Sequence, residues 1–320
     1  MSQAARALLY AFETGALARQ RAFFLRAEPT PLTGVDCEQS YRPDFLRLKD
    51  ATPRIEKGAY GLGLAMLTKH KEENFANIAR GRELLTDGGT LVCAGANEDG
   101  AASLERQVGK AFGLAGSLHK FHSRVFWFEK TGQPAPAYWQ KLAALQRVGD
   151  GSWLSQPGIF SWDRVDDGSA LLARHLPSDL SGQVADFGCG WGYLAREILG
   201  RCKDVVCIDL IDAEYLALEA ARANVTDERA SFHWLDLRTE APPGAYDAIV
   251  CNPPFHTGRA ATPALGQGVI EAAVCALKPG GRLLMVANRG LPYEFILRER
   301  CAFFEILADN NKFRVTCARR

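Results

Sequence analysis

The 320-residue sequence lacks any apolar run near the roughly 18 residues that a membrane-spanning helix needs. Its 9 cysteines include no Cys-x-x-Cys pair and mostly lie singly in apolar runs. This pattern argues against a disulfide framework or a zinc ribbon and favours reduced thiols. Residues 1–20 are amphipathic with internal charges, which predicts a helix and not a secretory signal. We therefore expect a cytoplasmic protein without a membrane span.

The sequence also lacks a strong excess of one charge. The net charge is +1, so no global field attracts the chain to a polyanion. Residues 1–150 hold 20 Lys and Arg against 16 Asp and Glu, whereas residues 151–320 hold 18 against 21. The basic excess in the first half is a weak indication of nucleic-acid binding there, and ordinary charge scatter explains it equally well.

What the second half does contain is a regular alternation of strand and helix. Residues 183–202 and 204–225 each predict a strand followed by a helix. Further strands are predicted by the segments SFHWLDL, AYDAIVCNPP, GRLLMVAN and KFRVTCAR. Such alternation predicts an α/β fold with a mostly parallel sheet covered on both faces.

The segment DFGCGWG between the first strand and its helix predicts a ligand site. Gly188, Gly190 and Gly192 remove the Cβ atom where the backbone turns tightly and approaches a ligand. Asp186 precedes them at the strand end. The following helix begins with free N–H groups, which favour an anionic or carboxylate-bearing ligand.

Two further carboxylates are predicted at strand ends in this half. Asp209 follows Asp186 by 23 residues, close to the ~20 residues expected for an acid that binds ribose hydroxyls. Asp236 follows the third strand, where it could accept a hydrogen bond from an adenine amino group. Glycines alone are compatible with a structural turn, but three acids at successive strand ends favour a nucleotide-cofactor site.

The turn reads G-x-G-x-G with an acid before it, whereas NAD-binding turns read G-x-G-x-x-G. This arrangement resembles the Rossmann-like class of S-adenosylmethionine-dependent methyltransferases. The resemblance implies S-adenosylmethionine as the cofactor.

The fourth strand ends in Asn252-Pro253-Pro254-Phe255, which resembles the N-P-P-F/Y signature of enzymes that methylate planar amino nitrogens. The resemblance implies that Asn252 lies against both the cofactor and the amine. The Asn252 side-chain oxygen and the Pro253 carbonyl oxygen can accept hydrogen bonds from the two N–H groups of the amine and so orient its nitrogen. Phe255 can stack on the base. His256 either touches RNA or only caps the turn.

Longer segments narrow the resemblance. PGIFSWDRVDDGSALLARHLP, NPPFHTG and VANRGLPY together resemble bacterial ribosomal RNA guanine-N2 methyltransferases, from about Pro157 to the C-terminus. These are tandem enzymes in which a degenerate methyltransferase-like domain precedes the active one. The resemblance implies ribosomal RNA or a ribosomal subunit as the partner, with the small subunit favoured. A glutamine-N5 or adenine-N6 methyltransferase and a non-catalytic RNA-binding or assembly factor remain alternatives.

The first half contains segments that resemble segments of the second half and follow one another in the same order, as a duplication predicts. Gly58 aligns with Gly244 at an offset of 186, and Gly88-Gly89 with Gly280-Gly281 at an offset of 192. Residues 119–130 also echo residues 311–320. We therefore predict two tandem Rossmann-like domains: residues 1–131 as a degenerate domain, residues 132–156 as a linker and residues 157–320 as the catalytic domain. Such a duplication can replace a dimer partner, so we expect a monomer.

The first copy lacks both the glycine-rich turn and the Asn-Pro-Pro-Phe segment. At the offset of 186, Met66 lies opposite Asn252, and Lys69-His70-Lys71 lies opposite Phe255-His256-Thr257. Lys69 and Lys71 suit phosphates better than a flipped base, which indicates an RNA-docking or scaffold role. A solvated basic loop explains them equally well. No metal site is predicted, because His119 and His122 have metal-ligand spacing but no cysteine or acid cluster beside them.

Overall fold

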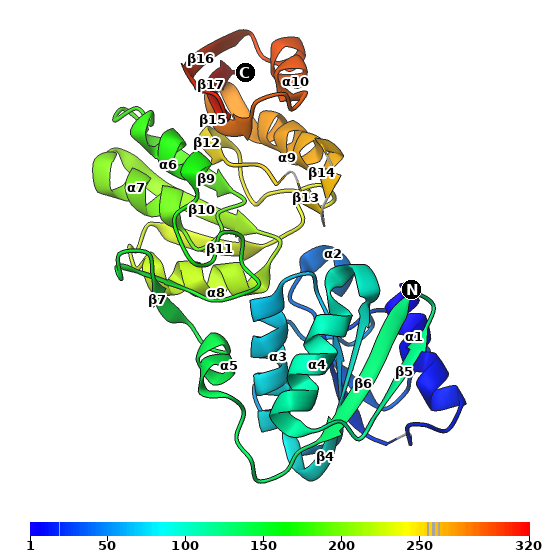
Figure 1. The fold of residues 1–320 in the computed structure, drawn as a ribbon. Helices are drawn as coiled ribbons and strands as arrows, with labels where there is room; N and C mark the ends of the chain where they lie inside the picture. Colours follow the sequence, from blue (N-terminus) through cyan, green and yellow to red (C-terminus); the bar gives the residue numbers. More distant parts are fainter. Residues whose placement is uncertain (19, 255, 258–259, 262) are drawn as a thin grey trace. The chain divides into compact units, whose positions relative to one another are not determined.

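The computed structural model describes residues 1–18, 20–254, 256–257, 260–261 and 263–320 (Figure 1). The chain divides into two compact units. The first comprises Met1–Gln146 with Gln156–Gly158, and the second comprises Arg147–Ser155 with Ile159–Arg320. The boundary therefore falls inside the 132–156 segment. Its first part belongs to the first unit, where Trp139 on α5 (Ala137–Leu142) is buried.

The second unit is built on a seven-stranded sheet of order β11-β10-β9-β12-β15-β17-β16. Its pairs are parallel from β11 to β15, and β17 runs antiparallel to both of its neighbours. Numbered along the chain, these strands have the order 3-2-1-4-5-7-6. The strands are β9 (Gly182–Phe187), β10 (Val205–Asp212), β11 (Ala230–Trp234), β12 (Tyr246–Cys251), β15 (Leu277–Asn288), β16 (Phe303–Asp309) and β17 (Phe313–Arg319).

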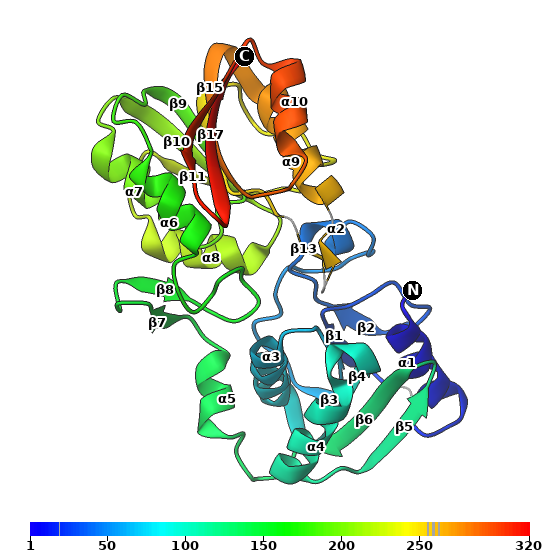
Figure 2. The ribbon, with the colours of Figure 1, turned by 45° about the horizontal axis from the view of Figure 1, so that its top comes forward.

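Helices cover both faces of this sheet (Figures 1 and 2). The helices α6, α7 and α8 pack with Val184, Leu210 and Val250 in one core, and α9 and α10 pack with Ala185 and Ile249 in the other. Successive strand residues point to opposite faces, so both faces are apolar. The helices are α6 (Asp167–Arg174), α7 (Tyr193–Arg201), α8 (Tyr215–Asn224), α9 (Pro263–Ala276) and α10 (Tyr293–Arg300). Two short two-stranded sheets join β7 (Gln146–Val148) with β8 (Trp153–Ser155) and β13 (His256–Thr257) with β14 (Ala260–Ala261).

The first unit has a six-stranded sheet of order β2-β1-β3-β4-β6-β5. Its pairs are parallel from β2 to β4, and β6 runs antiparallel to both of its neighbours. The strands are β1 (Ala22–Leu25), β2 (Val35–Cys37), β3 (Tyr60–Met66), β4 (Leu85–Ala96), β5 (Gly116–Lys120) and β6 (Ser123–Glu129). The helices are α1 (Gln3–Glu13), α2 (Arg42–Phe45), α3 (Lys71–Leu84), the 3-10 helix η1 (Asn97–Asp99), α4 (Ala101–Phe112) and α5. The order matches that of the second unit without a counterpart of β11.

The strand registers confirm that the two units are copies of one fold. Between β3 and β4 the register slips after Tyr60, which pairs with Leu85, so that Leu62 pairs with Thr90. Between β12 and β15 it slips after Tyr246, which pairs with Leu277, so that Ala248 pairs with Arg282. Residues of β3 and β12 are related by an offset of 186, and residues of β4 and β15 by an offset of 192, as the similar sequence segments predicted.

A glycine pair recurs at the slip in both copies. Gly88 and Gly280 have φ values of +77° and +78°, which a residue with a Cβ rarely adopts. A Cβ on Gly89 would lie 3.1 Å from the Tyr60 carbonyl oxygen, and a Cβ on Gly281 would lie 2.9 Å from that of Tyr246. The repeated glycines are therefore a requirement of the slipped backbone.

The two copies differ at the end of the strand that carries the glycine-rich turn. Leu25 pairs with Ala65 as Phe187 pairs with Cys251, so Arg26 occupies the position of Gly188. Both residues have positive φ, +51° and +75°. The Arg26 guanidinium, whose side chain is 13% exposed, donates from Nε to Oε1 of the buried Glu73 at 2.6 Å. A buried ion pair thus replaces the glycine turn in the first unit.

In the described part of the chain, no helix is long and apolar enough to cross a membrane. All nine cysteines are free.

The Arg26–Glu73 pair should contribute strongly to the stability of the first unit. Arg26→Met leaves the buried Glu73 carboxylate without its guanidinium and should lower the free energy of unfolding by about 3–5 kcal/mol. Arg21→Met is the matched control, because its ion pair with Asp36 is exposed and should contribute less than about 1 kcal/mol. Urea unfolding of the full chain measures both. Equal losses in the two variants would contradict the importance of the buried pair.

Candidate active site

The glycine turn and the Asn-Pro-Pro segment meet because their strands are neighbours. β9 pairs with β12 in parallel, and Phe187 opposite Cys251 is the last pair of the ladder. Gly188 and Asn252 follow directly, and a Cβ on Gly188 would lie 3.7 Å from the Asn252 carbonyl oxygen. Both segments therefore leave the carboxyl edge of the sheet side by side, where open α/β sheets bind ligands.

Each glycine of the turn has positive φ: +75° at Gly188, +53° at Gly190 and +87° at Gly192. The Gly188 N–H donates to the Ile211 carbonyl oxygen, which ties the turn to β10. A Cβ on Gly192 would lie 2.8 Å from Val225 Cγ2, so this glycine allows helix packing. Apart from its two chain neighbours, no described residue has an atom within 4 Å of the Cβ position of Gly190. Gly190 is thus the part of the turn that faces open space.

Asp186 lies in the interior below this turn and is fully buried. Its Oδ2 accepts from the Ala195 N–H at 3.1 Å, which joins α7 to β9. Its Oδ1 has no hydrogen-bond partner among the described residues. Burial raises the pKa of Asp186 to about 7, and the nearby Asp212 charge adds to the rise.

The acid at the end of β10 is Asp212, not Asp209. The prediction placed Asp209 at the strand end, but β10 continues for three residues to Asp212. Within the strand, Asp209 accepts from the Tyr246 hydroxyl at 2.8 Å and lies 3.0 Å from His233 Nε2. The first unit repeats the tyrosine contact between Tyr60 and Asp36 without any glycine turn. The contact of Asp209 with the tyrosine hydroxyl is therefore a feature that both copies of the fold share.

Sequence reasoning missed Asp212, although the segment CIDLID contains both acids and the second stands where the apolar run ends. Asp212 Oδ2 accepts from the Gly190 N–H at 2.8 Å, and its Oδ1 accepts from the Glu214 N–H at 2.8 Å. Burial raises the pKa of Asp212 to about 6. This carboxylate lies directly at the open part of the turn.

Asp236 follows β11, as predicted, but its carboxylate is already paired. Arg238 donates from Nε to Oδ1 at 2.7 Å and from Nη2 to Oδ2 at 2.8 Å. Despite its burial, these hydrogen bonds hold the pKa of Asp236 below its usual range. A contact between this carboxylate and an adenine amino group would have to be shared with Arg238.

The Asn252 side chain is held by two contacts to the start of α6. Its Nδ2 donates to Asp166 Oδ2 at 3.0 Å and to Ser169 Oγ at 2.9 Å. No described residue donates to its Oδ1. Among the described residues, the amide thus has its nitrogen bound and its oxygen open to a further donor. Sequence reasoning did not identify Asp166 or Ser169.

The remaining predicted residues lie in different places. Pro253 is buried and Pro254 is exposed. Phe255 lies outside the described residues. His256 begins β13, where its backbone pairs with Ala261, and its side chain is likewise outside the description.

Lys69 and Lys71 belong to the first unit, between the carboxyl end of β3 and the first turn of α3. Both are exposed. The Lys71 ammonium lies 5.4 Å from the centre of the Phe75 ring.

The described residues contain no group of three or more His, Cys, Asp or Glu side chains that could hold a metal ion. His119, which has metal-ligand spacing to His122, instead contacts Glu105 and Arg124 through its Nε2.

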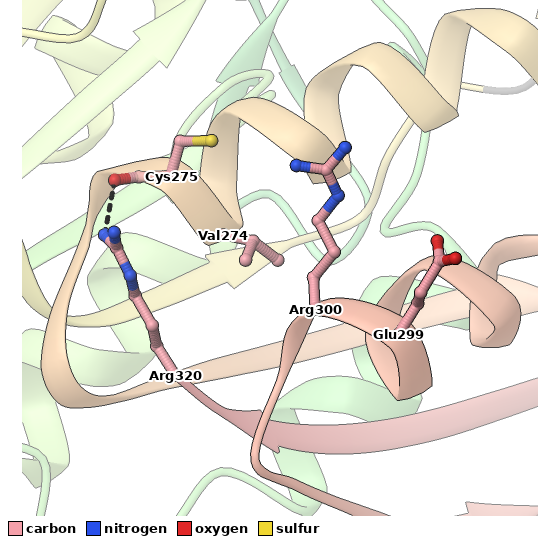
Figure 3. A pocket seen from close by; sticks show the side chains of 5 residues that line it. All are labelled: Val274, Cys275, Glu299, Arg300 and Arg320. Atoms are coloured by element: carbon pink, nitrogen blue, oxygen red, sulfur yellow. Dashed lines mark hydrogen bonds between the residues drawn. The ribbon is translucent and has the colours of Figure 1, made fainter.

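A pocket of about 430 Å³ lies away from these residues (Figure 3). It is lined by Val274, Cys275, Glu299, Arg300 and Arg320. Arg320 donates to the carbonyl oxygens of Cys275 and Leu277, where β15 begins, and Lys130 makes the matching contact to Leu85 in the first unit. The pocket is thus at the amino edge of the sheet, opposite the predicted site, and its Arg320 contact belongs to the duplicated fold.

The residues at the carboxyl edge fit S-adenosylmethionine. Gly190 leaves space beside the backbone, Asp212 offers acceptors to hydroxyl groups, and the unpartnered Oδ1 of Asp186 can take a further donor. Asn252 presents an acceptor for an amine beside the same turn. The fold and the site together define an S-adenosylmethionine-dependent methyltransferase of the Rossmann-like class.

Comparisons with known proteins agree with this class. The family model of the methyltransferase small domain matches residues 151–317. The ribosomal RNA small subunit methyltransferase C of Shewanella pealeana is 31% identical over 71% of this chain and 68% of its own length. The ribosomal RNA small subunit methyltransferase C of Citrobacter koseri is 32% identical over 77% of this chain and 72% of its own length. The chain belongs to the ribosomal RNA small subunit methyltransferase C family.

A solved structure confirms the two-unit fold. It is the T. thermophilus 16S rRNA N2 G1207 methyltransferase in complex with AdoMet and guanosine. It matches 100% of this chain and 92% of that chain with a TM-score of 0.78 at 22% identity.

The raised pKa of Asp186 predicts a pH-dependent stability. Between about pH 4 and pH 7 the folded chain retains a proton on Asp186 that the unfolded chain releases, so ionisation of Asp186 lowers the free energy of unfolding as pH rises through this range. Asp186→Asn removes this contribution. The free energy of unfolding of the variant, taken relative to that of the wild type, should therefore rise by on the order of a few kcal/mol between about pH 5 and about pH 8. Urea unfolding at both pH values measures the gain, and a pH-independent difference would contradict it.

Proposed function

We propose that this chain transfers the methyl group of S-adenosylmethionine to the N2 amine of a guanine in 16S ribosomal RNA. The observation that carries the proposal is the Asn252 amide beside the glycine turn, whose nitrogen is bound and whose oxygen receives no hydrogen bond from the described residues. The small-subunit enzymes among its relatives and the guanine-N2 activity named for the T. thermophilus structure support the choice of substrate.

The chemistry follows from the weak nucleophilicity of a conjugated amine. The bound cofactor supplies an electrophilic methyl group on a positively charged sulfur. The Asn252 Oδ1 and the Pro253 carbonyl oxygen each accept a hydrogen bond from one N–H group of the amine. These two hydrogen bonds orient the lone pair of the nitrogen and favour tetrahedral geometry. The nitrogen becomes acidic as it gains the methyl group, so no strong base is required. Phe255 would stack on the base and His256 would contact the RNA.

Cofactor binding is assigned to the glycine turn and to the strand-end acid. Gly190 would let the backbone approach the cofactor, Gly188 and Gly192 would allow the positive φ values that shape the cofactor turn, and Asp186 would support the turn from below. Asp212 would bind the ribose hydroxyls in place of Asp209, because Asp212 lies at the end of β10 and contacts Gly190. Asp236 would contact the adenine amine alongside Arg238.

The first unit would serve as an RNA-docking or scaffold module. Its buried Arg26–Glu73 pair occupies the position of the glycine turn, which argues against a second cofactor site. The exposed Lys69 and Lys71 would bind RNA phosphates. We further propose that the chain acts as a monomer in the cytoplasm, with residues 157–320 as the catalytic domain.

Transfer of labelled methyl groups tests the reaction. The purified chain is incubated with labelled S-adenosylmethionine and, separately, with deproteinised 16S RNA, 30S particles and 50S particles. Nucleosides are then separated after digestion. We expect label in N2-methylguanosine from 16S RNA or 30S particles, and at least about 100-fold less with Asn252→Ala, because the amine loses an oriented acceptor. The variant should retain cofactor binding.

Other products of this experiment would contradict the proposal. Label in N6-methyladenosine or in protein would indicate an adenine or glutamine methyltransferase. Absence of label from all three substrates would favour a binding or assembly factor. Full turnover by Asn252→Ala would disprove the role of that amide.

Paired substitutions distinguish the two acids of β10. Asp212→Asn should weaken S-adenosylmethionine binding by about tenfold or more, ~1.4 kcal/mol, because an amide accepts fewer hydroxyl hydrogen bonds. Asp209→Asn should stay within about twofold of the wild type. Since the pKa of Asp212 is raised to about 6, wild-type affinity should also fall as pH drops through about 6. Calorimetric titration measures each value. A larger loss in Asp209→Asn would restore Asp209 as the ribose-binding acid.

A further inference from the structure

The contacts of Asn252 with the start of α6 suggest a function beyond helix capping. Asp166 is the N-cap residue of α6, and its Oδ2 accepts from the Ser169 N–H at 2.8 Å. The same Oδ2 accepts from Asn252 Nδ2. A Cβ on Gly168 would lie 3.0 Å from this oxygen, so the glycine leaves room for the carboxylate. Asp166, Gly168 and Ser169 thus form a receptor for the Asn252 amide nitrogen, 86 residues along the chain from Asp166.

The direction of the amide follows from the chemistry of its partner. An ionised carboxylate can only accept hydrogen bonds, so the group of Asn252 that faces Asp166 must be its NH₂ group. The second N–H of that group is taken by Ser169 Oγ. Both donors are then bound, and the opposite end of the amide is its acceptor, Oδ1.

The first unit contains the corresponding helix start without a bound amide. Its α1 corresponds to α6: α1 packs on Leu62, Val92 and Val125, and α6 packs on Ala248, Leu284 and Val315. Leu62 and Ala248 are related by the offset of 186, and Val92 and Leu284 by that of 192. Val125 and Val315 pair with Ala94 and Val286, which are also related by 192. Ser2 caps α1 by accepting from the Ala5 N–H, as Asp166 caps α6 by accepting from Ser169.

All members of the receptor are absent together from the first unit. Aligning the two caps places Ser2, Ala4 and Ala5 at the positions of Asp166, Gly168 and Ser169, while Met66 stands opposite Asn252. The fold therefore needs a cap at this helix start but needs neither a carboxylate there nor a hydroxyl three residues later. Both are present where the amide is present.

We infer that Asp166 and Ser169 are positioning residues for methyl transfer: they bind the Asn252 amide nitrogen and thereby direct its Oδ1 toward the amine of the substrate. This inference rests on the proposed amine methylation, and it names the residues that make Asn252 an acceptor of fixed direction. A freely rotating amide would present its NH₂ group to the substrate amine in part of the molecules, and two donors repel.

An exchange of donor and acceptor tests the inference. In Asn252→Asp, two carboxylates face each other, and the kcat of methyl transfer should fall by about 100-fold or more because the pair repels. In the double variant Asp166→Asn with Asn252→Asp, the neutral amide at residue 166 removes the repulsion, and its NH₂ group can donate to residue 252 once the side chain turns so that its oxygen keeps the Ser169 N–H. The double variant should recover at least about tenfold in kcat over Asn252→Asp. If the two substitutions acted independently, the double variant would instead have a lower kcat than either single variant.

Asp167→Asn in the Asn252→Asp background is the matched control. Asp167 is the next residue, and its exposed carboxylate contacts Lys312 instead of Asn252. This control should give no recovery. Recovery by Asp167→Asn equal to that by Asp166→Asn would overturn the inference, because a general loss of negative charge would then explain both.

Two further measurements separate positioning from folding. Asn252→Asp should become faster as pH falls, because one proton shared by the two carboxylates restores the hydrogen bond, and the double variant should lack this response. Ser169→Ala should lower kcat severalfold with S-adenosylmethionine affinity and melting temperature near the wild-type values, and Ser169→Thr should restore kcat. A loss confined to melting temperature or cofactor affinity would overturn the inference.

The outcomes also separate this inference from the proposed function. If the wild-type chain forms no N2-methylguanosine, the proposed function fails. If the wild type is active and the double variant shows no recovery over Asn252→Asp, only the positioning role fails.

Discussion

The parallel pairing of β9 with β12 is the constraint on which the active site depends. Its last pair joins Phe187 and Cys251, so the next residue of each strand leaves the sheet at the same edge. That places the turn at Gly188 beside the carbonyl group of Asn252. A slip of one residue would send the side chains of β12 to the opposite faces of the sheet and would remove Asn252 from the turn. The apolar cores on both faces prevent such a slip, because they require alternate residues of each strand.

The duplication shows which features belong to the fold and which belong to the chemistry. Both copies keep the register slip, the glycine pair beside it and a tyrosine hydroxyl bound to an aspartate in the neighbouring strand. Only the second copy has the glycine turn and the bound amide. The first copy has Arg26 at the turn, in a buried ion pair with Glu73. The first copy therefore keeps the sheet without the glycine turn, since the sheet depends on the shared features.

This comparison also explains which site residues could be predicted from sequence. Gly188, Gly190, Gly192 and Asn252 stand next to one another in short motifs whose local geometry is demanding. The choice between Asp209 and Asp212 depends on where β10 ends, and its end depends on pairing with β9 and β11. Periodicity along one strand does not contain that information. For Asp236, the competing partner Arg238 is only two residues away, but its bidentate geometry follows from the folded loop.

The sequence by itself determined the α/β class, the duplication with its two offsets, the glycine turn and the Asn-Pro-Pro-Phe segment, because each is a local pattern of residue types. Only the tertiary structure decided which acid stands at the strand end and which way the Asn252 amide points. The physical reason is that both depend on contacts between distant segments. The amide direction is set by a carboxylate 86 residues away, and a carboxylate that can only accept hydrogen bonds leaves the amide a single orientation.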